Sequence, residues 1–259
     1  MTPGEAGLAW DPFRLKTKDG LWLTGWLVRH PRPRGILLLF HGYGTCKADL
    51  LDLAQAFHEN GSYHLLLPDF RGHGESEGWT ISFGLRDVSD IQEIISQLAG
   101  DPEFTGLPIG CYGISMGGAI GLLAAARSPQ IRAVVADSAY ADLAKAIARI
   151  QWISYYIPRF PLGQMVIWGT QLRLACRLQT LSPVYCIGRI APHGVLIIHG
   201  MKDQAILPSH AEALYQAAGE PKELWLVPEA EHVASFYRNQ KDYLHRVLGF
   251  FENAFQGTS

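Results

Sequence analysis

Residues 108–129 read PIGCYGISMGGAIGLLAAARSP, an apolar run followed by a serine with a glycine two residues away on each side. The apolar run predicts a strand, and the small residues after Ser115 predict a helix. A residue at so sharp a turn takes a strained backbone conformation, which only small neighbours such as Gly113 and Gly117 permit. The turn would also hold Ser115 above a helix N-terminus, where backbone N–H groups stabilise negative charge, so Ser115 is a candidate nucleophile. The alternative is a glycine-rich helix start without a chemical role.

The rest of the chain alternates strand and helix patterns. Residues 13–28 alternate apolar and polar side chains about a turn at 18–20, which indicates an antiparallel hairpin. Apolar residues recur with helical spacing in 48–61 and 82–100. Short apolar runs, typical of strands buried on both faces, lie at 35–40, 64–68, 131–136, 194–200 and 223–228. We therefore expect an α/β fold in which a mostly parallel, doubly wound sheet is flanked by helices.

Length and composition limit the classes of protein. The 259 residues, 48% of them hydrophobic and 18% charged, suffice for one large globular domain. The net charge of −2 gives no general attraction to nucleic acid, so we expect no nucleic-acid partner. Four cysteines without a CxxC pair favour free thiols in a reducing compartment over a disulfide scaffold or a zinc site. Since we find neither an export signal nor a run of about 18 apolar residues, we expect a cytoplasmic protein.

Residues 141–189 depart from this alternation and predict a helical cap inserted into a core formed by 1–140 and 190–259. The segment is rich in aromatic residues, and we expect Trp152 and Tyr156 to contact a substrate. It contains six basic residues and a single acidic one. One interpretation is an amphipathic cover whose basic groups face water. The other is a lid that collects anionic or amphiphilic substrates, which would also allow a lipid or membrane interface.

Two further segments offer the base and the acid that a serine nucleophile requires. Asp203 follows the apolar run 194–200, and His232 follows the run 223–228. The carboxyl ends of parallel strands share one edge of a sheet, so both side chains would lie at the edge that Ser115 occupies. Each alone could be an ordinary turn or helix-entry residue, but the chain order Ser, Asp, His is the one expected for this architecture. We therefore predict that these three side chains converge.

An acyl-transfer site also needs donors for a developing oxyanion. HGYG at 41–44 follows another apolar run, and its glycines would let the loop turn its amides toward the serine. We assign the donors to the backbone N–H groups of Tyr43 and Met116. The Tyr43 ring could form a wall of the substrate pocket, and His41 is interpreted as a residue that braces the loop.

Together these motifs resemble the α/β-hydrolase superfamily over nearly the whole chain. The similarity rests on HGYG (41–44), PDFRGHGESEG (68–78), GISMG (113–117), HGMKDQAILP (199–208) and EHV (231–233). They look most like the branch of small serine esterases, lysophospholipase-like and acyl-aminopeptidase-like hydrolases. The resemblance implies an eight-stranded sheet with a cap after the sixth strand.

The resemblance also implies residue roles. Ser115 would be the nucleophile, His232 the general base and then acid, and Asp203 the group that orients His232. Residues of the 68–78 segment, namely Asp69, Arg71 and His73, would fix a loop by hydrogen bonds.

These features predict a serine hydrolase that needs neither a cofactor nor a metal and acts on a small-molecule carboxylic ester. Thioester, lysophospholipid and acyl-peptide substrates would use the same machinery. A non-catalytic ligand-binding or membrane-peripheral protein with the same fold is the remaining alternative, although such a protein would not need all three groups. The sequence makes no prediction of the oligomeric state.

Overall fold

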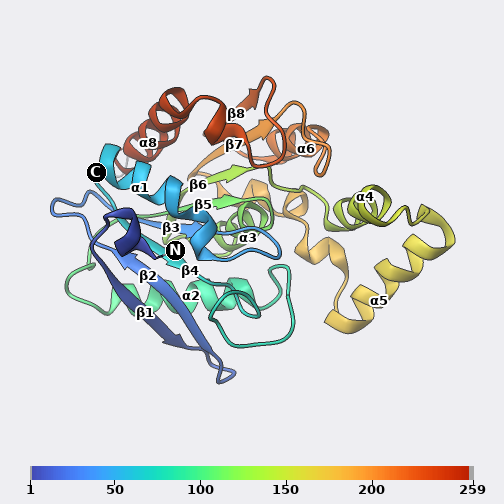
Figure 1. Ribbon diagram of the computed structural model, residues 1–259, viewed down its shortest axis with the longest axis horizontal. Coiled ribbons are helices and arrows are strands. Elements are labelled where there is room, and N and C mark those ends of the chain that lie inside the picture. The colour runs from blue at the N-terminus through green and yellow to red at the C-terminus, as the bar shows by residue number, and fades with distance from the viewer. Residues whose placement is uncertain (1, 257–259) are drawn as a thin grey trace.

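The computed structural model describes residues 2–256, which are built around one sheet of eight strands (Figure 1). The strands are β1 (Trp10–Lys16), β2 (Trp22–Val28), β3 (Ile36–Phe40), β4 (His64–Pro68), β5 (Ile109–Ile114), β6 (Ile131–Asp137), β7 (Gly194–Gly200) and β8 (Lys222–Val227). Their order across the sheet is β1-β2-β4-β3-β5-β6-β7-β8. The first hairpin is antiparallel, β2 pairs antiparallel with β4, and every later pair is parallel. The expectation of a mostly parallel, eight-stranded sheet is confirmed.

Helices cover both faces of the sheet. The α-helices are α1 (Leu51–Asn60), α2 (Asp87–Ala99), α3 (Met116–Ala125), α4 (Leu143–Tyr155), α5 (Gln164–Leu174), α6 (Ser209–Ala217), α7 (Ser235–Arg238) and α8 (Gln240–Gln256). Side chains of α1 and α8 form one core with one face of the sheet, and those of α2, α3 and α6 form the other. In β3, Leu37 and Leu39 enter the first core, whereas Leu38 and Phe40 enter the second. This alternation explains why the strand sequence is apolar at every position.

The helix expected over 82–100 begins later than its apolar spacing indicated. Phe83 and Gly84 have positive φ values of 52° and 100°, so the chain makes a turn there and α2 starts at Asp87. The Asp87 carboxylate accepts hydrogen bonds from the Ser82 hydroxyl and from the Gly84 amide. The local side-chain bonds therefore favour the turn over one more helical turn.

The chain between β6 and β7 forms α4, the kinked segment η3 (Arg159–Gly163), α5 and three short 3₁₀ turns. The turns are η4 (Leu178–Leu181), η5 (Pro183–Tyr185) and η6 (Ile187–Ile190); two others, η1 (Pro3–Ala6) and η2 (Lys47–Leu50), lie early in the chain. In Figure 1, α4 and α5 stand to one side of the main body. We call the chain from α4 to α5 the helical insertion.

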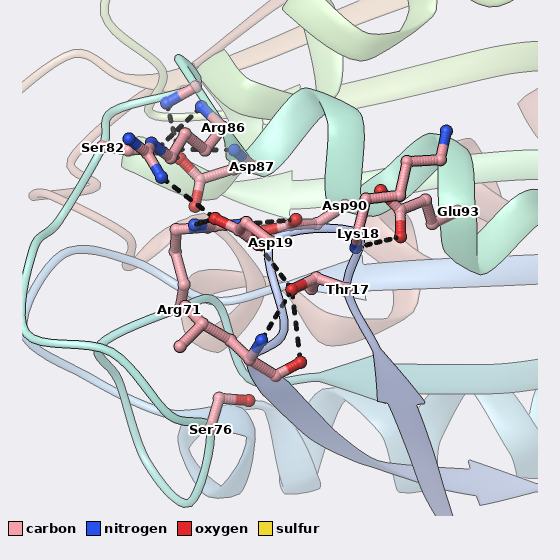
Figure 2. A network of polar contacts seen from close by, with 12 residues as sticks. Thr17, Lys18, Asp19, Arg71, Ser76, Ser82, Arg86, Asp87, Asp90 and Glu93 are labelled. Carbon is pink, nitrogen blue, oxygen red and sulfur yellow. Dashed lines mark hydrogen bonds and ion pairs between the residues drawn. The ribbon is translucent and has the colours of Figure 1, made fainter.

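A buried arginine ties the first hairpin to α2 (Figure 2). Arg71 donates two hydrogen bonds to the Asp90 carboxylate, from Nε at 2.7 Å and from Nη2 at 2.6 Å. It also donates from Nη1 to Asp19, in the hairpin turn, at 2.9 Å, and Arg86 donates to that carboxylate at 3.0 Å. Burial opposes the Arg71 charge, but the bonds to Asp90 and Asp19 outweigh it and raise the pKa of Arg71. These contacts agree with the loop-fixing role expected for Arg71.

Candidate active site

Ser115 lies at the turn between β5 and α3 with φ 51° and ψ −117°. This is the strained conformation expected from the sequence, and its two glycine neighbours are sterically required. A Cβ at Gly113 would lie 2.4 Å from the backbone of Gly117, and one at Gly117 would lie 2.4 Å from the carbonyl oxygens of Phe40 and His41. The crowding atoms belong to backbone and cannot rotate away. The glycines therefore allow α3 to start directly against the end of β3.

The three side chains predicted from distant parts of the sequence meet at this turn. His232 Nε2 lies 3.0 Å from Ser115 Oγ, and His232 Nδ1 lies 2.6 Å from Asp203 Oδ2. With a proton on Nδ1, the imidazole donates to the carboxylate and leaves Nε2 free to accept the serine proton. The arrangement can therefore activate the Ser115 hydroxyl as a nucleophile.

Asp203 is buried and held in its ionised form. Its Oδ1 accepts hydrogen bonds from the amides of Ala205 and Ile206, each at 2.9 Å. His199 Nε2 approaches Oδ2 to 3.2 Å and also donates to the Ile206 carbonyl at 2.7 Å. Burial alone would raise the pKa of Asp203, but the bonds from His199 and His232 reverse this effect and lower it to about 2. The carboxylate is thus charged at neutral pH, as an orienting partner of His232 must be.

A buried network beneath the site fixes the loop that carries His232. The Val233 amide donates to Ser138 Oγ at 3.1 Å, and Ser138 Oγ in turn donates to Asp137 Oδ1 at 2.9 Å. Tyr243 donates from its hydroxyl to the other Asp137 oxygen at 2.8 Å. Ser138 and Val233 have positive φ values of 56° and 58°, so two strained turns are bonded to each other directly behind the histidine. Our sequence reasoning did not identify this network, because its members are ordinary polar residues until the fold joins them.

The loop after β3 brings a second backbone segment to the serine. A Cβ at Gly42 would lie 3.7 Å from the Ser115 Cβ, so Tyr43 follows immediately beside the nucleophile. Among the described residues, no acceptor is hydrogen-bonded to the Tyr43 amide, and the Met116 amide belongs to the first turn of α3, where helical partners are absent. Both predicted donors therefore belong to segments that border Ser115 and are available to an oxyanion.

His41 braces this loop, as expected. Its Nδ1 donates to the Gly42 carbonyl at 2.8 Å, and its Nε2 accepts from the Phe70 amide at 3.0 Å. Burial lowers the pKa of His41 to about 4, so the ring is neutral at pH 7 and can both donate and accept.

Asp69 and His73 also hold loops in place. The Asp69 carboxylate accepts from the Lys47 amide at 2.8 Å, from Lys47 Nζ at 2.5 Å and from the Glu75 amide at 2.9 Å. His73 Nε2 accepts a long bond of 3.4 Å from the Gly44 amide. Sequence reasoning missed Lys47, whose buried ammonium is matched by the Asp69 and Glu75 carboxylates.

A cavity of about 590 Å³ opens onto Ser115 and Met116. Its walls are mostly apolar and come from the β3 loop, the segment 79–83, α4 and α5. They include the Tyr43 ring, which stacks on Phe83 with 5.8 Å between ring centroids. A larger hollow of about 860 Å³, lined by the start of α4, by α5 and by the chain that follows it, includes none of the three converging side chains. The smaller cavity is therefore the candidate substrate site.

Trp152 and Tyr156, expected to contact substrate, do not line this cavity. The residues of α4 that do line it follow a helical stripe: Leu143, Ala146, Ile147, Ile150, Gln151 and Tyr155. Trp152 is rotated about 100° from its neighbour Gln151, which turns it away from the cavity, and Tyr156 is the left-handed residue that ends the helix. Both rings are exposed, by 50% and 79%. Helical spacing over 143–151 places most of these side chains on one face, but the packing of α4 decides that this face turns toward the cavity.

One charged side chain, Arg173 of α5, lies among the residues that line the cavity. Within residues 2–256, no cluster of three or more His, Cys, Asp or Glu side chains could hold a metal ion. Over the same residues, none of the helices combines the length and the apolar composition needed to cross a bilayer.

Comparison with known proteins identifies relatives of the whole fold. The family described as serine aminopeptidase, S33, matches residues 31–177. An uncharacterised protein of Bacillus subtilis, YqkD, is 30% identical over 93% of this chain and 79% of its own length. The Arabidopsis thaliana α/β-hydrolase domain-containing protein WAV2 is 24% identical over 97% of this chain and 82% of its own. The Pyrococcus furiosus esterase Pf2001 superposes with a TM-score of 0.81 at 21% identity, covering 98% of this chain and 96% of its own. The expected α/β-hydrolase fold is thus confirmed.

Proposed function

Because this chain belongs to the serine aminopeptidase S33 family of α/β hydrolases, we propose that it is a serine hydrolase that cleaves carboxylic esters through an acyl-enzyme. One observation carries the proposal: His232 bridges Ser115 and Asp203, with 3.0 Å between His232 Nε2 and Ser115 Oγ and 2.6 Å between His232 Nδ1 and Asp203 Oδ2. These distances lie within the range over which a base removes a proton directly.

In this mechanism, Ser115 Oγ attacks the acyl carbonyl carbon while His232 Nε2 takes its proton. The oxyanion accepts hydrogen bonds from the Tyr43 and Met116 amides, each worth roughly 3 kcal/mol of transition-state stabilisation. The imidazolium formed is stabilised by the Asp203 carboxylate. His232 then returns the proton to the alcohol oxygen as the C–O bond breaks, which leaves the acyl group on Ser115. A water molecule deprotonated by His232 attacks this ester, and the acid departs as Ser115 regains its proton.

The chemistry of the cavity favours an ester over a peptide with a free amino terminus. An aminopeptidase must hold the ammonium group of its substrate, and a carboxylate is the usual partner for that charge. Among the described residues that line the cavity there is neither aspartate nor glutamate, and the charged group is the Arg173 guanidinium. The same lining suits an apolar acyl or alcohol group of moderate size that carries a polar or anionic end.

Covalent labelling tests the proposal. A fluorophosphonate probe, which bonds only to an activated serine hydroxyl, should label the wild type and fail to label Ser115→Ala. Ser96→Ala is the matched control, since Ser96 is an exposed serine of α2 whose hydroxyl donates to the Gln92 carbonyl. A correctly folded wild type that the probe leaves unmodified would refute the mechanism and favour a non-catalytic binding protein.

Substrate class is tested by kcat/KM on matched esters, thioesters and amides that share one acyl group. We expect the order of kcat/KM to be ester, then thioester, then amide, across p-nitrophenyl esters of short, medium and long acyl chains. A preference for the amide would instead favour a peptidase.

The cytoplasm is the location that we propose. The four cysteines are free thiols in the structure, which supports a reducing compartment. Cell fractionation tests this location, and recovery in an oxidising compartment would contradict it.

A further inference from the structure

Helix α5 is apolar on its outer face as well as on its inner one. Ile167 and Leu174 pack inward against the core. Met165, Trp168 and Leu172 follow each other at intervals of three and four residues, so they share one face. That face is open to solvent, with exposed fractions of 58%, 60% and 84%. A helix with two apolar faces leaves one of them to a partner.

Further large apolar side chains are exposed on α4 and η3, which pack against α5 and against each other. Large side chains at the end of α4 and in η3 are half to four-fifths exposed. We call the whole set the insertion face; it consists of Trp152, Tyr155, Tyr156, Phe160, Leu162, Met165, Trp168 and Leu172. Figure 1 shows these helices standing at the side of the molecule, away from the sheet. So many large exposed apolar residues on one segment mark an interaction surface.

The charge of the helical insertion indicates which kind of partner the insertion face binds. The helical insertion, residues 143–174, holds four of the 22 lysines and arginines and none of the 24 acidic residues. The chain is therefore positive where the insertion face lies and negative elsewhere. Lys145 and Arg173 of this segment are exposed, as is Arg177 just after it. Tryptophan and tyrosine rings beside arginine and lysine are the combination that binds the interface of an anionic bilayer.

We propose that the insertion face docks on the surface of an anionic phospholipid bilayer. A second copy of the chain fits this face less well. A symmetric contact would place the same positive charges opposite each other, and residues 143–202 contain no carboxylate to neutralise them. A bilayer supplies both an apolar layer for the aromatic rings and negative headgroups for the basic side chains.

The insertion face adjoins the candidate substrate cavity. Tyr155 is 70% exposed and also lines the cavity, and Val166, next to Met165, does the same at 41% exposure. Arg173 of the same helix completes that wall. If the proposed esterase function holds, an amphiphilic ester can pass from the bilayer to Ser115 without crossing water. The docking itself does not depend on catalysis.

Vesicle binding by the inactive Ser115→Ala protein tests docking separately from chemistry. We expect cosedimentation with vesicles of phosphatidylcholine and phosphatidylglycerol, and much weaker binding to phosphatidylcholine alone. Higher salt should weaken the binding at least about tenfold, because it screens the arginine contribution. Brominated lipid should quench the tryptophan fluorescence of the bound protein, and this quenching should fall when Trp168 is replaced.

Matched variants locate the surface. Trp168→Ser/Leu172→Ser should bind about 100-fold more weakly, because each large apolar side chain contributes roughly tenfold to partitioning. The control Trp22→Ser/Tyr237→Ser removes two exposed aromatic rings, of 44% and 59% exposure, outside the insertion, and should bind as the parent does. When Ser115 is intact, Trp168→Ser/Leu172→Ser should still hydrolyse a soluble p-nitrophenyl ester but should lose hydrolysis of an ester carried in vesicles.

Three results would overturn docking on lipid. They are an absence of binding to anionic vesicles at low salt, equal binding by the two double variants, and a dimer in sedimentation velocity that only the Trp168/Leu172 pair dissociates. An inert enzyme whose Ser115→Ala form still binds vesicles would refute the esterase proposal and leave the docking surface in place.

Discussion

Two glycines of α3, four residues apart, should respond in opposite ways to the same substitution. In Gly117→Ala, the new Cβ would lie 2.4 Å from the carbonyl oxygens of Phe40 and His41, a separation that real Cβ atoms essentially never show. In Gly121→Ala, its nearest neighbours would be the Phe40 ring at 3.5 Å and the Val134 side chain at 3.6 Å, which is ordinary contact. The pair therefore compares a forbidden position with a permitted one in the same helix.

The expected magnitudes follow from these contacts. Gly121→Ala should raise the free energy of unfolding by about 0.5–1 kcal/mol, because alanine loses less backbone entropy in a helix. Gly117→Ala should lower it by about 2–3 kcal/mol, because backbone rather than a flexible side chain must move. The backbone that moves carries the loop to Tyr43, so ester hydrolysis should also fall, by about 100-fold.

Urea unfolding followed by circular dichroism measures the first effect, and kcat/KM on a p-nitrophenyl ester measures the second. Gly121→Ala is expected to keep the kcat/KM of the wild type. Equal stability of Gly117→Ala and Gly121→Ala would contradict a clash at Gly117. The link from this turn to the oxyanion donors fails if Gly117→Ala is destabilised but hydrolyses esters at the rate of the wild type.

Three further substitutions test the loops and charges around the site. His41→Leu leaves the buried Gly42 carbonyl and Phe70 amide without their partner, which costs roughly 1–3 kcal/mol of stability for each group. Because His41 braces the loop of the oxyanion donors, kcat should fall while KM changes little. Steady-state kinetics that show a raised KM and an unchanged kcat would contradict this role. The folded-state pKa of Asp203, about 2, lies below its ordinary value of 3.8, so ionised Asp203 adds about 2 kcal/mol of stability above pH 5, which is lost as the pH falls through 2. The difference in the free energy of unfolding between the wild type and Asp203→Asn, measured in urea, should therefore narrow between pH 5 and pH 2. A difference that stays constant over this range would argue against a lowered pKa of Asp203. Arg71→Lys loses the bidentate bond to Asp90 and should lower the free energy of unfolding by about 3 kcal/mol. Arg86→Lys changes an exposed single contact and should lower it little. Equal urea midpoints for the two variants would show that the buried bidentate bond contributes no extra stability.

The sequence determined the features that depend on local pattern. A strand buried on both faces must be apolar at every position, so β3 to β7 could be identified from their composition. Gly113 is required by sterics within a few residues of Ser115, so the sharp turn was also predictable, whereas the clash that a side chain at Gly117 would make is with the end of β3. Parallel strands end at one edge of the sheet, which is why Asp203 and His232 could be assigned to the same rim.

Tertiary structure alone decided which groups support these residues. Asp137, Ser138 and Tyr243 join behind His232 only because β6, the loop after β8 and α8 come together, and no spacing in the chain records that contact. The second histidine on Asp203, His199, depends on the path of the loop after β7. The direction in which α4 turns its side chains depends on how it packs, so Tyr155 lines the cavity while Trp152 faces solvent. A sequence records the period and the burial of each element, but the angle at which one element meets another is set by the packing of all of them.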